Sequence, residues 1–135
     1  MEFKALIGSY AEQFQIGDIV PDEEGVVRLN ADGIGISLKP TPDGESAQIR
    51  VRVGDLPADR GELMMRMMEA MFLGRRTGSS VFVVKPGCDT CFLQQTLPLA
   101  RIGLDELDLE LGKMVDLAEI CESVIAEGRK ETQWN

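Results

Sequence analysis

The apolar residues nearest the N-terminus recur at the spacing of a helix. They are Phe3, Leu6, Ile7, Tyr10 and Phe14. This spacing predicts an amphipathic helix over residues 2–14, and Gly17 and Pro21 mark where the chain leaves it. Such a helix usually lies on a sheet. Because three of its five apolar residues are aromatic, a helix that faces a partner is the second interpretation.

Strict alternation of apolar and polar residues then predicts three strands joined by short hairpins, each with one buried face. Their apolar positions are Val27 and Leu29, then Ile34, Ile36 and Leu38, then Ile49, Val51 and Val53. Residues 30–33 and 41–44 carry turn-favouring Asn, Asp, Pro and Gly. Arg50 and Arg52 fall on the wet face, where we expect solvation, with contact to acidic groups of a partner as the alternative.

The next segment is apolar on nearly its whole circumference. Asp59 and Glu62 have the spacing of a capping box, which predicts a helix that begins at Asp59, and Gly74 suits a left-handed cap at its end. The apolar residues form two adjacent stripes, one of Leu63, Met67, Ala70 and Met71 and the other of Met64, Met68 and Phe72.

A helix that is apolar all round is a buried helix. One interpretation is a central core helix in a monomer. We favour the other, in which the second stripe forms a subunit interface, because a small sheet covers only one face of the helix and C2 homodimers are the commonest oligomers. Methionine also suits adaptable binding surfaces.

Two more strands and a long acidic helix complete the chain. Residues 81–84 and 91–97 read as strands around the Pro86-Gly87 turn, and Pro98 ends the second. A helix is predicted over residues 104–128, followed by a frayed tail from Lys130. Its apolar seam consists of Leu104, Leu107, Leu111, Met114, Ala118, Cys121 and Ile125. Eight acids and one lysine share that span, so a helix packed on a sheet is favoured over a coiled coil.

The resulting order is α-β-β-β-α-β-β-α, an α+β fold with an antiparallel sheet flanked by helices. The 135 residues suit a single domain over 1–135, homodimeric by the argument above. A domain of this size needs neither a metal nor disulfides to fold.

Charge and composition remove several classes of function. With 14 basic and 23 acidic residues the net charge is −9, which argues against binding to nucleic acid or to an anionic membrane and favours solubility and a basic partner. The chain has no histidine, which excludes Ser-His-Asp and Cys-His catalysis. The N-terminus lacks a signal-peptide core, no stretch could span a bilayer, and three cysteines fit a reducing cytoplasm.

The one chemical motif is Cys88-Asp89-Thr90-Cys91. A thioredoxin-type pair sits at a helix N-terminus, whereas this pair falls in a predicted hairpin turn before a strand. A zinc knuckle needs two further ligands, and Cys121 is the only other thiol. We therefore interpret both as ordinary reduced cysteines and predict no enzyme activity, no catalytic residues, no metal and no cofactor.

The pattern resembles the type III secretion chaperones of the CesT (Tir chaperone) family over nearly the whole chain. The stretches that carry the resemblance are residues 63–71, Thr77-Gly78, Val81-Phe82-Val83, Leu97-Pro98-Leu99 followed by Leu104 and Leu107, and Gly54-Asp55-Leu56-Pro57. Two departures from the family pattern are a missing asparagine in Phe72-Leu73-Gly74 and Cys121 where an aromatic residue is common.

The resemblance implies a cytoplasmic bacterial homodimer that serves an injection apparatus. Such chaperones hold an N-terminal segment of a secreted effector in extended form, soluble and export-competent, without ATP. On this basis we expect effector contacts at Phe3, Leu6, Ile7, Tyr10, Ile34, Ile36 and Val83. We expect the dimer contact at Met64, Met68, Met71 and Phe72. A non-secretory adaptor that sequesters a protein is the runner-up, and a thiol enzyme using Cys88 and Cys91 ranks third.

Overall fold

The computed structural model describes residues 2–17, 19–72 and 78–134, with side chains as far as residue 126. The elements in chain order are α1 (Phe3–Gln13), β1 (Val27–Ala31), β2 (Ile34–Pro40), β3 (Ser46–Asp55), α2 (Gly61–Met71), β4 (Val81–Val84), β5 (Thr90–Pro98) and α3 (Leu104–Trp134). The predicted order of elements is confirmed.

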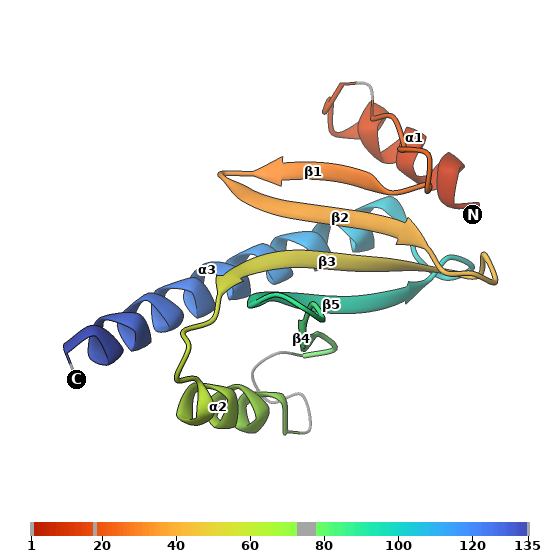
Figure 1. Cartoon of the computed structure of the whole chain (residues 1–135). Helices are drawn as coiled ribbons and strands as arrows, with labels where there is room; N and C mark the ends of the chain where they lie inside the picture. Colours follow the sequence, from red (N-terminus) through yellow and green to blue (C-terminus); the bar gives the residue numbers. More distant parts are fainter. Residues whose placement is uncertain (1, 18, 73–77, 135) are drawn as a thin grey trace.

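The five strands form one antiparallel sheet in the order β1-β2-β3-β5-β4 (Figure 1). The β1–β2 hairpin shows how sequence sets the register. Asp32 and Gly33 both have positive φ, as a type I′ turn requires, and Asn30 Oδ1 accepts the Gly33 N–H at 2.9 Å. Hairpins join β1 to β2, β2 to β3 and β4 to β5, and β5 pairs with β3. The two edge strands are therefore β1 and β4.

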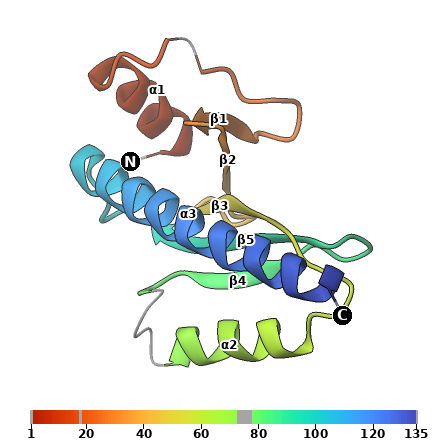
Figure 2. The same ribbon diagram turned by 90° about the vertical axis from the view of Figure 1, so that its left-hand side faces the viewer.

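The core lies between one face of the sheet and the helix α3, which passes behind the strands in Figure 1. The predicted α3 seam faces the sheet: Leu107, Leu111, Met114, Ala118 and Ile125 are buried. On the sheet, Ile49, Val51 and Leu93 are fully buried. Because side chains alternate along a strand, the same face carries apolar residues from every strand, and the opposite face is left without a helix among the described residues (Figure 2).

A polar link ties the β4–β5 side of the sheet to α3. Ser80 and Gln95 are buried, and Ser80 Oγ donates to Gln95 Oε1 at 3.0 Å. The Gln95 amide in turn donates to Glu110 on α3 at 3.1 Å. These bonds satisfy polar groups that would otherwise destabilise the core.

Two predicted helix boundaries are wrong. Helix α2 begins at Gly61 with Arg60 as N-cap and no side-chain capping bond, so Asp59 does not form a capping box with Glu62. Glu62 instead forms an ion pair with Arg66 one turn later, and 3.0 Å separates Glu62 Oε1 from Arg66 Nη2. The expected cap at Gly74 lies outside the described residues. Helix α3 continues to Trp134, because Gly128 is followed by helix-forming Arg129, Lys130 and Glu131, so no frayed tail begins at Lys130.

We expect Leu107→Ala to lower the free energy of unfolding by about 2–5 kcal/mol, because it leaves a cavity where α3 meets the sheet. Leu109, two residues later on the same helix, is 57% exposed. Leu109→Ala should change stability by less than about 0.5 kcal/mol. Urea unfolding followed by circular dichroism measures both, and equal losses would contradict the packing described.

Candidate partner-binding groove and subunit contact

A groove of about 370 Å³ opens where α1, β1, β2 and the first half of α3 meet. Its apolar walls are Tyr10, Ile16, Leu29, Ala31, Ile36, Leu111 and Val115. Ile16 is largely exposed, and Leu29 and Val115 are half-buried. Asn30, Asp108 and Asp116 form a polar rim. An apolar floor with polar groups at the rim is the usual composition of a binding site.

Hydrogen bonds fix α1 beside α3 and so set the width of this groove. The Tyr10 hydroxyl donates to Asp108 Oδ1 at 2.8 Å, and the Gln13 amide donates to Asp105 at 3.0 Å. Burial, followed by the bond to the Asp108 carboxylate, raises the pKa of Tyr10, so the hydroxyl remains a donor to Asp108 in alkaline solution as well as at neutral pH. The Tyr10 and Phe14 rings pack with centroids 4.8 Å apart, which stiffens the exposed end of α1.

Gly112 keeps the α3 wall of the groove open. It lies within a long helix, where glycine is less favourable than alanine by about 0.5–1 kcal/mol. A Cβ at this position would meet nothing within 4 Å, so packing does not require glycine here. A larger side chain would enter the groove.

The two edges of the sheet differ in their availability. At β4, Met71 of α2 lies against the edge, and its Sδ accepts the Phe82 N–H at 3.1 Å. At β1, the outward-facing backbone groups have no strand partner among the described residues. An unpaired edge can hydrogen-bond an added strand. The β1 edge also adjoins the groove, which its residues Leu29, Asn30 and Ala31 line.

Six of the seven residues expected to contact an effector are buried in the core: Phe3, Leu6, Ile7, Tyr10, Ile34 and Ile36. Tyr10 and Ile36 reach the groove, and the others support its walls. Val83 lies on the opposite face of the sheet, half-buried and opposite Phe92. The sequence analysis did not single out three other residues that line the groove, Ile16, Gly112 and Val115. Ile16 lies in the loop after α1, and Gly112 and Val115 lie on α3 outside its apolar seam.

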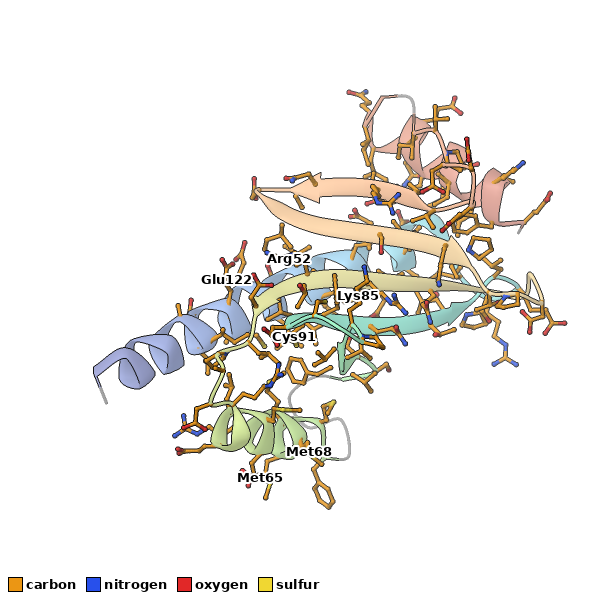
Figure 3. All side chains as sticks on the ribbon, viewed as in Figure 1. Arg52, Met65, Met68, Lys85, Cys91 and Glu122 are labelled. Atoms are coloured by element: carbon orange, nitrogen blue, oxygen red, sulfur yellow. The ribbon has the colours of Figure 1, made fainter. Side chains whose placement is uncertain are left out.

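Helix α2 stands outside the sheet, beyond β4 (Figures 1 and 2). Its inner stripe of Leu63, Met67, Ala70 and Met71 is half-buried against the body of the protein. Its outer stripe is exposed, with Met68 and Phe72 at 62% and 61% and Met64 at 40%. Met65 is also exposed, and Met65 and Met68 both point away from the sheet (Figure 3).

A second apolar hollow, of about 540 Å³, separates α2 from the second half of α3. Leu63 and Met67 line one side, and Leu117, Ile120 and Val124 line the other. Ile120 is 63% exposed, so the apolar surface of α2 continues onto α3. Contiguous apolar surface of this kind marks an interaction site.

The three cysteines are free and differ in environment: Cys88 is exposed, Cys91 buried and Cys121 half-buried. Burial, and then the nearby Cys121, raises the pKa of Cys91 to about 11, and burial raises the pKa of Cys121. Reactive thiols have lowered pKa values.

Across the described residues, no group of three or more Cys, Asp or Glu side chains could hold a metal ion. None of the helices described is long and apolar enough to cross a membrane.

Comparisons with known proteins agree with the fold. A model of the Tir chaperone protein (CesT) family matches residues 5–122. No curated protein matches the sequence. The ExsC–ExsE complex aligns with a TM-score of 0.76 at 17% identity, covering 93% of this chain and 97% of that chain. The HopA1–SchA chaperone–effector complex aligns with a TM-score of 0.76 at 11% identity, covering 90% and 93%.

A third similar structure is the type III secretion chaperone SycH of Yersinia pestis with a stable fragment of YscM2. It aligns with a TM-score of 0.70 at 17% identity, covering 87% of this chain and 97% of that chain. At these identities the likeness establishes the fold.

We expect one of the three thiols to react rapidly with a thiol reagent at pH 8, because only Cys88 is exposed. The raised pKa of Cys91 keeps it protonated at this pH, so Cys91 and Cys121 should react only after denaturation. Reaction with a chromogenic disulfide measures this. Cys88→Ser should abolish the fast phase, and a fast phase that survives in this variant would contradict the assignment.

Proposed function

Because the chain belongs to the Tir chaperone protein (CesT) family, we propose that it is a type III secretion chaperone that binds the N-terminal segment of a secreted effector. It holds that segment in extended form and keeps it soluble and export-competent. The observation that carries this proposal is the open β1 edge beside an apolar groove. A similar structure, the HopA1–SchA complex, is of a chaperone with its effector.

An extended segment can use both features together. Its backbone pairs with the outward groups of β1, and every second side chain then points toward the face that carries the groove. Exposed Ile16 and half-buried Leu29 offer apolar contact there, and buried Tyr10 and Ile36 also line the groove. Since the segment loses conformational entropy on binding, several such contacts are needed along its length. The remaining candidates, Phe3, Leu6, Ile7 and Ile34, act by holding α1 and β2 in place.

The protein works as a homodimer in this proposal. Met64, Met68 and Phe72 form the centre of the contact, and Met71 supports it from the inner stripe. The support is physical: three large apolar side chains on one helix face are otherwise left in water, and burying each contributes about 1.5–3 kcal/mol. Ile120 of α3 lies across the second hollow from the inner stripe and adds exposed apolar surface near α2.

No catalytic step is part of the proposal. The buried thiol of Cys91 has a raised pKa, which is the reverse of what a thiol nucleophile or redox pair needs. Binding alone, in the bacterial cytoplasm where effectors await export, accounts for the role. Its direct test is isolation of the protein from its native cell, identification of the bound protein and proteolysis of the complex, which should leave an N-terminal segment protected.

We expect Met68→Glu to convert the dimer to a monomer, because a carboxylate at the centre of an apolar contact loses its hydration. Light scattering measures the mass. Leu109→Glu is the matched control, since Leu109 is exposed to a similar degree but lies on α3, and it should leave the dimer intact. A dimeric Met68→Glu variant would show that the contact lies elsewhere.

We expect Gly112→Trp to weaken effector binding by about tenfold, or about 1.4 kcal/mol, because the ring fills the groove. Gly112→Ala adds no bulk of consequence and should raise the free energy of unfolding by about 0.5–1 kcal/mol. Titration calorimetry with the identified effector segment measures both. Unchanged binding by a folded Gly112→Trp variant would remove the groove from the site.

A further inference from the structure

The sheet face opposite α3 carries a charge opposite to that of the chain. Figure 1 looks onto this face. A hollow of about 500 Å³ lies over it, and five cations line the hollow: Arg28, Lys39, Arg50, Arg52 and Lys85. Glu24 is the one acid among its lining residues within the part of the chain described. In a chain of net charge −9, this concentrates more than a third of the basic residues on one face.

Two of these cations already form ion pairs with acidic residues beside the hollow. Arg28 pairs with Asp22, and Arg52 pairs with Asp55 at 3.2 Å. The other three, Lys39, Arg50 and Lys85, form no ion pair with any residue that the structure describes.

Arg50 lies at the centre of the face and is held ready for a ligand. Its Nε donates to Gln94 Oε1 at 2.8 Å. This bond orients the guanidinium, and its terminal nitrogens remain to bind a carboxylate, which arginine recognises with two parallel bonds. Figure 3 shows Arg52 and Lys85 on the same side of the sheet.

Two other features of the face point to a peptide rather than a simple anion. Gln48 lines the hollow, and a side-chain amide can both donate to and accept from a peptide backbone, which a simple anion cannot match. Phe92 lines the hollow, half-buried opposite Val83. It offers an apolar contact for a side chain.

We propose that this basic face binds an extended acidic segment of a protein partner, with carboxylates on Lys39, Arg50 and Lys85 and an apolar side chain on Phe92. The site lies on the opposite face of the sheet from the groove, so it takes a different stretch of chain and does not depend on the proposed function. Nucleic acid fits less well, because the chain as a whole repels a long polyanion.

Fluorescence anisotropy with a short labelled peptide tests this. In the peptide, glutamate alternates with serine around one central phenylalanine. The full-length protein should bind it, and higher salt should weaken binding. The triple variant Lys39→Gln, Arg50→Gln, Lys85→Gln should raise Kd by about tenfold, which three exposed ion pairs can supply. The peptide with glutamine in place of glutamate should bind as weakly.

The matched control removes the same amount of positive charge on the helical side of the protein. Its substitutions are Lys4→Gln, Arg101→Gln and Lys113→Gln, all at exposed positions. It should keep Kd within about twofold. The proposal is overturned if the wild type does not bind, if both triple variants lose binding equally, or if single-stranded DNA of equal length binds as tightly through the same cations. A change in oligomeric mass in the first triple variant would also overturn it, by placing this face between copies.

Discussion

The packing of α3 across one face of the sheet determines where every other surface lies. The α3 seam, with Leu107 and Met114 fully buried, covers the centre of that face. Helix α1 is then attached to the side of α3 through Tyr10 and Asp108, and the space left between α1, β1 and α3 becomes the groove. No comparable face remains for α2, which rests on the edge of β4 with its outer methionines in water.

The two edges of the sheet acquire different roles from this arrangement. Helix α2 lies beyond the β4 edge, where Met71 Sδ accepts the Phe82 N–H, and its outer apolar stripe is exposed. The β1 edge stays open beside the groove and suits an extended partner. In the proposed dimer, the subunit contact and the groove lie at opposite edges of the sheet.

The periodicity of apolar residues predicted the fold well, because the burial of those residues determines which face of each helix or strand packs inward. Apolar residues recur at every second position in the strands and at every third or fourth position along the α3 seam. Each of these spacings is typical of one type of element. Helix ends were predicted less well, because capping depends on a single residue: Arg60, not Asp59, precedes α2, and Gly128 does not end α3. The lining of the candidate groove was predicted in part. Tyr10 and Ile36 belong to it, but Ile16 and Gly112 are brought to it only by tertiary packing. The two stripes of α2 could be read from the sequence, and the stripe expected at a subunit interface, Met64, Met68 and Phe72, is the one that stays exposed.

In the proposed mode of binding, a partner strand adds to the β1 edge and its side chains fill the adjacent groove. Hydrogen exchange, measured by mass spectrometry on the protein alone and on its complex with the bound effector, tests it most directly. We expect slower exchange of the backbone amides of residues 27–31 in the complex, with no comparable change in β4. Unchanged exchange in residues 27–31, with protection confined to β4 or α2, would contradict it.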